Sequence, residues 1–472
     1  MLAVLALAGL GIAGIYAATA GRANPDPDVA NFALKQAAWV FLGLVVFAVA
    51  LVPSYTRLAH YSYVLYGASI LVLAGLALFR HQEWEIPGLL YPINQAYSWI
   101  KIPGTGQSIQ PSELTKLAFI MALAYYLRYR KNYRTFPGLL VPFAMALVPT
   151  ALVLYQPDLG TGMLFLPILF LMLFAAGARG KHLLAIIAMG LAMVPVFYSS
   201  MHGYQRIRID SWLLQGCAER MHFAIREARA DAVDDDPPLP ASIAAPKPDL
   251  PDQEKAALAR DITSMWRFRL WRLATAVSWG RDKPEFADAR RRLFETLDRG
   301  PGPEAYTALR RFFASILADY GHQAFQATIA VGAGGRTGCG WLQGSQTRHG
   351  LLPEAHTDFL FPTLAEQFGF VGAAAVVVLY GLLCVLGIDV SFSTEEPFGK
   401  LLVVGVVAQF AAQSFLNLAM SVGLVPVTGI PLPLMSYGGS SMLSSFLALA
   451  LLCNVALRRL YLIAPRPFEW RE

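Results

Sequence analysis

The segment Glu354-Ala355-His356-Thr357-Asp358 carries the side chains in this sequence that are best suited to chemistry. It leads directly into the apolar residues 359–361, which open a long hydrophobic stretch. A carboxyl group at the edge of an apolar wall resists ionisation, so its pKa rises toward that of a useful general base. We therefore expect Asp358 to act as a catalytic base. The alternative is that Thr357 or Asp358 only caps the helix that follows.

A glycine-rich stretch lies shortly before this segment. It contains Gly332, Gly334, Gly335, Gly338, Gly340 and Gly344. Glycine lets the backbone approach a ligand closely, and neighbouring amide groups can bind phosphate. Gly334 and Gly335, with the nearby cations Arg336 and Arg348, are therefore candidates for binding an anionic part of a substrate. A glycine-rich loop is a weak signal when it stands alone.

The string Gln110-Pro111-Ser112-Glu113-Leu114-Thr115-Lys116 opens another apolar stretch. Proline followed by serine and glutamate is typical of the first turn of a helix. Lys116 follows Glu113 by three residues, so both side chains lie on one face of that helix. One interpretation is a capped helix with a neutralised ion pair. The other is a polar cavity in which Glu113 and Lys116 meet an anionic substrate.

The string Gln156-Pro157-Asp158-Leu159-Gly160-Thr161 separates two further apolar stretches. A turn followed by a helix that Asp158 caps explains most of this pattern. Substrate binding by Asp158 is the alternative.

A further interruption covers residues 429–441, where prolines, glycines and serines break an apolar region. Irregular backbone is not tolerated where it faces lipid, so a segment of this kind is expected to line a cavity inside the protein. Ser436 and Tyr437 are then candidates for substrate binding. A plain loop is the alternative.

Membrane-spanning helices are the elements that must position these residues. Of the 472 residues, 56% are hydrophobic and 15% are charged, whereas soluble domains have about 45–50% apolar and about 25% charged residues. Several apolar runs come close to the roughly 20 residues that a helix needs to cross a bilayer. We expect an all-α polytopic membrane protein with about ten spans. They are placed near 2–20, 38–52, 63–79, 114–127, 139–155, 160–177, 183–200, 362–388, 401–423 and 439–457.

Lysine and arginine are unevenly distributed between the two sets of short loops. One set carries basic clusters such as residues 128–134, whereas the other holds only Arg22, Lys35, Arg80 and Lys101. Because basic loops remain in the cytoplasm, both termini are expected there. The net charge of +6 therefore reports membrane topology, and no nucleic-acid partner is expected.

Five regions follow from this topology. Residues 1–200 hold helices 1–7, residues 201–320 form an extracytoplasmic loop with a helical insertion, residues 321–361 form a glycine-rich catalytic loop, residues 362–460 hold helices 8–10, and residues 461–472 form a cytoplasmic tail. Within the insertion, residues 231–252 are acidic and proline-rich, which predicts a flexible linker. Segments 211–230, 252–279, 284–297 and 303–320 are predicted to be helical. A disulfide between Cys217 and Cys339 is left open.

Taken together, the motifs resemble those of the SEDS family of cell-wall polymerases, whose members are RodA, FtsW and their sporulation relative. The strings that carry the resemblance are QPSELTK, QPDLGTG, GSQTRHGLLPEAHTDFLF and GLVPVTGIPLPLMSYGGSS. The resemblance covers nearly the whole chain except about residues 213–319, and the last string is more similar to RodA. The insertion either alters partner docking or access to the site, or is a decoration without a catalytic role.

This resemblance implies an inverting peptidoglycan glycosyltransferase that polymerises lipid II at the outer face of the bacterial cytoplasmic membrane. Undecaprenyl pyrophosphate would be the leaving group, and the process would be elongation or division. The implied partner is a class B penicillin-binding protein with transpeptidase activity. The family's essential aspartate falls on Asp358, and its other polar positions fall on Glu113, Lys116 and Asp158. A divalent cation, Mg²⁺ or Mn²⁺, is implied, although the sequence has no metal-ligand pattern.

Two other functions remain open on the sequence. A flippase for a lipid-linked precursor would also need broken helices and buried polar groups. A flippase requires polar groups through the whole depth of the membrane, whereas the motifs here lie at the predicted outer ends of the spans. A non-catalytic scaffold for the wall machinery is the third interpretation, and it would tolerate replacement of Asp358 and Lys116.

Overall fold

The structure is a computed structural model. It describes residues 1–20, 22, 29–82, 98–102, 107–130, 132–194, 197–198, 206, 208–215, 217, 251–276, 284–300, 302–316 and 322–458. The predicted linker at 231–252 lies almost entirely outside these residues, and the predicted tail at 461–472 lies wholly outside them.

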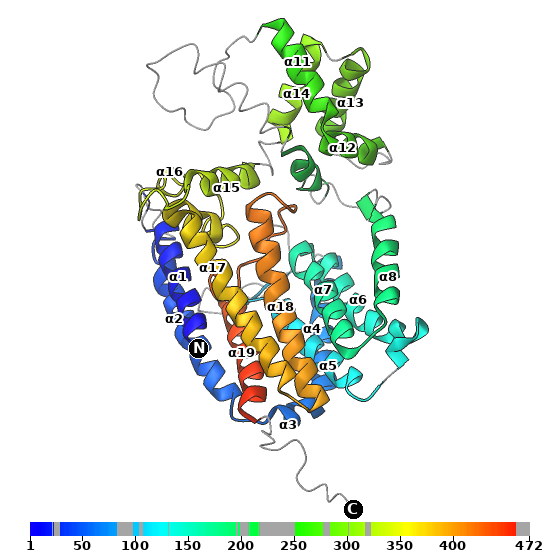
Figure 1. Cartoon of the computed structure of the whole chain (residues 1–472), viewed down its shortest axis with the longest axis vertical. Helices are drawn as coiled ribbons and strands as arrows, with labels where there is room; N and C mark the ends of the chain where they lie inside the picture. Colours follow the sequence, from blue (N-terminus) through cyan, green and yellow to red (C-terminus); the bar gives the residue numbers. More distant parts are fainter. Residues whose placement is uncertain are drawn as a thin grey trace, which may run out of the picture.

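A helical bundle forms the main body of the molecule (Figure 1). Its helices are α1 (Leu2–Ala18), α2 (Phe32–Ala50), α3 (Tyr55–His60), α4 (Ser62–His81), α5 (Pro111–Leu127), α6 (Leu140–Tyr155), α7 (Leu159–Ala176), α8 (Gly180–Ala192), α17 (Leu360–Phe392), α18 (Pro397–Ser421) and α19 (Gly439–Arg458). A small antiparallel hairpin, β1 (Ile100–Ile102) and β2 (Gln107–Ile109), precedes α5 and pairs Lys101 with Ser108.

Each of the ten predicted spans falls on a helix of this bundle, so the prediction of an all-α membrane protein is confirmed. Among the described residues, seven helices are long and apolar enough to cross a bilayer, while α1 and α8 are shorter apolar helices. Helix α8 ends at Ala192, before the predicted end at residue 200, and α5 begins with the polar turn that contains Glu113. Large apolar side chains such as Phe41, Leu71 and Val378 are exposed, as lipid contact requires. The chain is a multi-pass membrane protein.

Several helix ends meet at one end of the bundle. The backbone amide of Gln110, just before α5, donates to Ser440 Oγ in the first turn of α19 at 2.9 Å. Asn417, near the end of α18, donates to the carbonyl group of Asp358, just before α17, at 2.8 Å. All the motifs singled out in the sequence therefore lie at the same end of the bundle, although they are far apart in the chain.

Helix α17 is broken at Gly369, where φ is +64° and ψ is −159°. The glycine-rich stretch takes over the hydrogen bonds that the break releases. The amides of Cys339 and Gly340 donate to the carbonyl groups of Glu366 and Gln367 at 2.9 and 3.1 Å. In return, Phe370 donates to the Gly335 carbonyl group at 2.9 Å. Because a broken helix leaves backbone groups without partners, this exchange completes α17.

The predicted catalytic loop at 321–361 is therefore only partly a loop. It begins with helix α15 (His322–Ala333) and also contains the short helix α16 (Ser345–Arg348). The amides of Gln346 and Thr347, at the start of α16, donate to the buried carboxylate of Glu366 at 2.7 and 3.0 Å. Glycine composition predicted a loop here, but packing against α17 imposes helical structure on both sides of the glycines.

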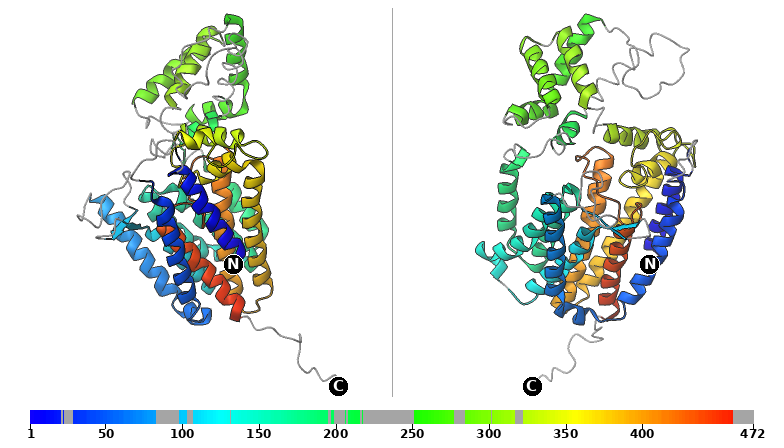
Figure 2. Two further views of the ribbon diagram at one scale, coloured as in Figure 1. Left: turned by 90° about the vertical axis from the view of Figure 1, so that its left-hand side faces the viewer. Right: turned by 180° about the vertical axis from the view of Figure 1, so that it is seen from behind.

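The insertion forms a small helical domain beyond the end of the bundle at which the motifs gather (Figures 1 and 2). Its helices are α11 (Asp252–Ser264), α12 (Trp266–Ala276), α13 (Pro284–Asp298) and α14 (Pro303–Ile316). They enclose a core of their own that includes Trp271, Leu309 and Phe312. The predicted single helix at 252–279 is two helices, because the backbone turns at Met265, where ψ is 136°.

Cys339 is a free thiol at the surface, whereas Cys217 is buried in the core of the insertion. The disulfide that the sequence left open between them is therefore not formed.

Gly338 provides a test of the fit between the glycine-rich stretch and α17. Its φ is +88°, and a Cβ atom there would lie 2.0 Å from the carbonyl oxygen of Gln367. We expect Gly338→Ala to destabilise the protein by about 1–3 kcal/mol, because the side chain is both strained and obstructed. The measurement is thermal unfolding in detergent.

Gly332→Ala is the matched control, since a Cβ atom at residue 332 meets nothing within 4 Å. Equal melting temperatures for the two variants would show that the contact with α17 does not constrain this stretch.

Candidate active site

The segment that carries Asp358 is held by its backbone. Three successive carbonyl groups accept hydrogen bonds: that of His356 from the Tyr437 amide at 2.9 Å, that of Thr357 from Ser436 Oγ at 2.5 Å, and that of Asp358 from Asn417 Nδ2 at 2.8 Å. The donors come from α18 and from the irregular segment 422–438. This arrangement fixes where the Asp358 side chain begins.

Asp358 does not cap the helix that follows it. The N-cap position of α17 is Phe359, which makes no side-chain capping bond, and Thr357 Oγ1 bonds instead to Glu354 Oε2 at 3.0 Å. The capping alternative for this segment is therefore wrong. The half-buried carboxylate of Asp358 is left available for chemistry.

The surroundings of Asp358 raise its pKa to about 7. Burial in a poorly solvated site is the largest cause, and the negative charges of Glu354 and Asp158 act in the same direction. The positive charge of Arg208 opposes them and lowers the pKa. A carboxyl group with a pKa near neutral pH is suited to take up a proton from a hydroxyl group.

Arg208 is the residue of this site that sequence reasoning missed. A Cβ atom built on Gly429 would lie 3.5 Å from Asp358 Oδ2 and 4.0 Å from Arg208 Nη1. The carboxylate and the guanidinium group therefore lie near one another beside Gly429, and their separation cannot exceed the sum of these two distances. The rule that ionisable groups beside span ends are functional candidates would have included Arg208.

Gly429 itself leaves the space between these two groups open. Its φ is +73°, a conformation that side chains disfavour, and any side chain would enter the region between Asp358 and Arg208.

Asp158 caps α7, as the sequence predicted. Its Oδ1 accepts from the Thr161 amide at 3.0 Å, and its Oδ2 accepts from Gln110 Nε2 at 2.6 Å. Burial raises its pKa, with the charge of Glu113 acting in the same direction. Asp158 thus joins the start of α5 to the region of Asp358.

Glu113 and Lys116 form the predicted ion pair, with Lys116 Nζ 2.8 Å from Glu113 Oε1. Both side chains are almost completely buried. Lys116 also donates to Gln413 Oε1 at 3.3 Å, and Ser444 Oγ donates to Glu113 Oε2 at 2.9 Å. The ion pair therefore connects α5 with α18 and α19.

The segment between α18 and α19 is irregular and largely buried, so it is not an exposed loop, and substrate binding by this segment stays a prediction. Leu432, Leu434 and Met435 are at most 1% exposed. Ser436 donates through its side-chain Oγ to the backbone of the Asp358 segment, and the ring of Tyr437 stacks on Phe32 with ring centroids 4.3 Å apart. In this structure both predicted residues support the segment that carries Asp358.

Gly334, Gly335, Arg336 and Arg348 lie on the side of the site formed by the glycine-rich stretch. Both arginines are exposed. The amides of Gly334 and Gly335 already donate to carbonyl groups of residues 330 and 332. Binding of an anion by these four residues therefore stays a prediction, and the structure offers the nearer cation, Arg208.

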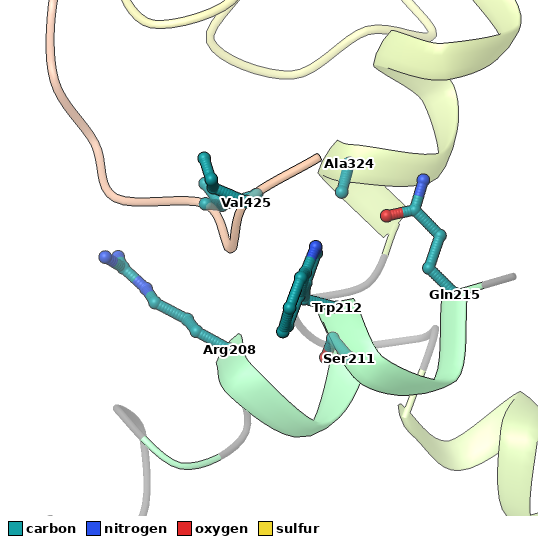
Figure 3. Close-up of a pocket in the computed structure, with 7 residues that line it drawn as sticks. Arg208, Ser211, Trp212, Gln215, Ala324 and Val425 are labelled. Atoms are coloured by element: carbon teal, nitrogen blue, oxygen red, sulfur yellow. The ribbon is translucent and has the colours of Figure 1, made fainter. Parts of the chain in front are cut away.

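A small cavity lies beside Arg208 (Figure 3). Its walls come from the helical segment 208–215, from α15 and from the residues after α18. The lining residues are Arg208, Ser211, Trp212, Gln215, Ala324, Val425 and Val427.

Among the described residues, no three His, Cys, Asp or Glu side chains gather closely enough to hold a metal ion. Both carboxylate oxygens of Asp158 also accept hydrogen bonds from the protein. Within the part of the chain that the structure describes, the side chains therefore do not form a protein-held divalent cation site.

The sequence matches the model of a family of cell cycle proteins, FtsW/RodA/SpoVE, over residues 1–218 and 306–460. The peptidoglycan glycosyltransferase RodA of Treponema pallidum is 29% identical, over 98% of this chain and 97% of its own length. A probable peptidoglycan glycosyltransferase, FtsW of Thioalkalivibrio sulfidiphilus, is 31% identical, over 96% of this chain and 88% of its own.

Solved structures share the fold. The rod shape determining protein RodA of Thermus thermophilus has a TM-score of 0.54 at 22% identity, with 97% of this chain and 95% of that one covered. A chain of a peptidoglycan synthase complex that coordinates polymerization and crosslinking has a TM-score of 0.60 at 24% identity, with 96% and 95% covered.

The buried ion pair of α5 provides a test of what Lys116 contributes. Lys116→Met leaves the Glu113 carboxylate buried without its cation, and we expect it to cost about 3–5 kcal/mol of stability. The double variant Glu113→Gln/Lys116→Met removes both charges and is expected to recover most of that loss. Thermal unfolding in detergent measures both effects. A single variant as stable as the double variant would contradict the proposed pairing.

Proposed function

The chain belongs to the FtsW/RodA/SpoVE family of cell cycle proteins, and we propose on this basis that it is a peptidoglycan glycosyltransferase that polymerises lipid II into glycan strands. The observation that carries the proposal is the carboxyl group of Asp358, whose pKa lies near 7. It faces the cation Arg208 beside a glycine that leaves the intervening space open.

In the proposed reaction, the Asp358 carboxylate takes the proton from the 4-hydroxyl group of the acceptor N-acetylglucosamine. The oxygen of that hydroxyl group attacks the anomeric carbon of the donor glycan. The new glycosidic bond forms as the bond to the diphosphate breaks, so the configuration inverts and undecaprenyl pyrophosphate leaves. An inverting displacement of this kind needs one base, and Asp358 is the residue that we assign to this role.

The departing diphosphate carries negative charge, which a nearby cation must stabilise. Arg208 is the group that we assign to this role, because its guanidinium lies beside the base and Arg can bind phosphate oxygens in pairs. Lys116 is completely buried and bound to Glu113 and Gln413. We therefore give Lys116 and Glu113 the role of holding α5 against α18 and α19, which places Asp158 near Asp358.

The distribution of polar groups favours a polymerase over a flippase. Asp358 and Asp158 lie just before the first turn of a helix, and the Glu113–Lys116 pair lies in the first two turns of α5. These helix starts meet at one end of the bundle. A transporter would need polar groups through the whole membrane depth. Chemistry at one membrane surface needs them on one side only.

The location of the site follows from the charge bias of the loops. We place both termini in the cytoplasm and the site at the outer face of the bacterial cytoplasmic membrane. A class B penicillin-binding protein is the proposed partner, which would supply the crosslinking activity. The similarity in fold to a chain of a peptidoglycan synthase complex supports this pairing.

A divalent cation remains part of the proposal only as a companion of the substrate. Since the described residues do not form a cage for it, the ion would arrive bound to the diphosphate. No step of the mechanism above depends on it.

Asp358→Asn tests the proposed base directly. The amide is nearly the same size as the carboxyl group but cannot take up the proton, so we expect polymerisation to fall by about 10²–10⁴-fold. The measurement is the formation of glycan chains from labelled lipid II by purified protein, alone and with a candidate transpeptidase.

Thermal unfolding of Asp358→Asn should match that of the wild type. Near wild-type polymerisation by this variant would remove Asp358 as the base, and a wild-type protein that makes no glycan under any of these conditions would overturn the function itself.

The pH dependence of polymerisation gives a second test. The base must be deprotonated, so the rate should rise with pH through about 7, the pKa of Asp358. Glu354 raises that pKa by its negative charge. Glu354→Gln should therefore lower the pKa and extend activity to more acidic conditions. A profile that stays in place or moves to higher pH would contradict the assigned electrostatics.

A further inference from the structure

The insertion has no role in the reaction as described so far. The family model matches nothing between residues 218 and 306, and helices α11, α12 and α13 fall wholly within that gap. Yet the insertion begins only a few residues after Arg208, which faces the catalytic carboxylate. The segment between them, helical residues 208–215 together with Cys217, is called the connector helix below.

The connector helix has two faces with different partners. Residues 208, 211, 212 and 215 recur at helical spacing and so lie on one face. Residues 210, 213, 214 and 217 recur at the same spacing on the opposite face. A helix that is contacted on both faces transmits position from one neighbour to the other.

The first face lies against the membrane bundle and the active site (Figure 3). Trp212 Nε1 donates to the carbonyl group of Gly423, just after α18, at 3.0 Å. Gln215 Nε2 donates to Thr328 Oγ1 of α15 at 2.9 Å. Arg208 stands at the start of the same face, beside Gly429 and Asp358.

The second face is buried in the core of the insertion. Leu213, Leu214 and Cys217 are at most 4% exposed and pack in one cluster with Trp271 of α12 and Phe312 of α14. The guanidinium of Arg267, also on α12, lies 5.6 Å from the ring of Trp212. The insertion therefore encloses one side of the connector helix and reaches round to the other.

We propose that the insertion positions a charged group of the active site. Its core holds the connector helix against the bundle and thereby fixes the guanidinium of Arg208 opposite Asp358. This inference rests on the proposed function, because it assigns a role to Arg208 in that reaction. Leu214, which joins the connector helix to the core, and Trp271, at the centre of the core, are positioning residues in this sense.

The physical reason is the difference between the contacts of the two faces. Most helical stability in a protein comes from tertiary packing and not from helix propensity, so these contacts decide where the connector helix lies. Each of the two hydrogen bonds to the bundle adds little net stability, because the same groups would otherwise bond to water. Complete burial of an apolar side chain, as for Leu213 and Leu214 in the insertion core, adds more for each residue. The insertion core therefore supplies the larger share of the stabilisation.

The pH at which Asp358 is half protonated depends on how near Arg208 lies, because the positive charge of Arg208 favours the carboxylate. The charged groups that act on Asp358 are Glu354 from its own segment, Asp158 from the start of α7, and Arg208 from the connector helix. His356 lies two residues away, and burial lowers its pKa, with Glu354 and Arg22 acting on it in opposite directions. Of these three charged groups, Arg208 is the one that the connector helix carries, so we expect a change in the insertion to alter the charge acting on Asp358 through Arg208.

The experiment compares the pH midpoints of four variants in the full-length protein. Arg208→Gln removes the cation and should move the acid limb of polymerisation to higher pH, on the order of half a pH unit or more. Leu214→Ala and Trp271→Leu loosen the insertion core, and each should move the acid limb of polymerisation to higher pH by a smaller amount. Leu270→Ala is the matched control, because Leu270 lies on α12 with its side chain 46% exposed, and it should leave the midpoint in place.

A double-mutant cycle completes the test. If the insertion acts through Arg208, adding Leu214→Ala or Trp271→Leu to Arg208→Gln should give no further shift. A merely structural role would lower the yield or the rate equally at every pH and leave the midpoint unchanged. Unshifted midpoints in both core variants, or full additivity in the double variants, would overturn the proposal.

A readout without turnover separates this inference from the proposed function. Carbodiimides label protonated carboxyl groups, so mass spectrometry of Asp358 labelling against pH gives its midpoint in inactive protein as well. Hydrogen exchange of residues 208–215 shows whether each core variant has loosened the connector helix. If either Leu214→Ala or Trp271→Leu fails to fold, the other variant is used for the test. A variant that loosens the connector helix but leaves the labelling midpoint of Asp358 unshifted would also overturn the proposal.

Discussion

Three hydrogen bonds to three successive carbonyl groups are the interaction on which the candidate active site depends. They run to residues 356, 357 and 358 from donors at Tyr437, Ser436 and Asn417. A carboxylate at the start of a helix ordinarily accepts hydrogen bonds from the first amides of that helix and so acts as its cap. Here Tyr437, Ser436 and Asn417 hold the backbone of the segment, and the Asp358 side chain makes no capping bond. The irregular segment between α18 and α19 exists in this form because it must present these donors.

The same demand for backbone partners explains the rest of this end of the bundle. Away from water, each unpaired amide or carbonyl group is costly, so broken helices must be completed by neighbouring chain. The break of α17 at Gly369 is completed by residues 335–340. Asn417 likewise serves two carbonyl groups at once, those of Asp358 and Ile430. The glycines and prolines of these motifs are thus part of one connected backbone network around Asp358.

Electrostatics then decide what the network can do. Asp358 and Asp158 influence one another, and the Glu113–Lys116 pair lies within reach of Asp158. Arg208 is the cation that enters this largely acidic region from outside the bundle. It reaches the site on a helix whose other face belongs to the insertion, so a domain beyond the family's common core contacts the side of the molecule where the base lies.

The sequence by itself determined the ten apolar helices, their order and the chemical candidates at their ends. Length and hydropathy are local properties, and the bilayer leaves helices as the one available structure for such segments. The cap at Asp158 and the pair of Glu113 with Lys116 were also predictable, because both partners lie within one turn. Tertiary structure alone decided what the glycines at 334–344 contact, that Asp358 is not a cap, and that Arg208 faces it. Each of these depends on groups that are scores of residues apart in the chain, and only the packing of α17, α18 and the connector helix brings them together.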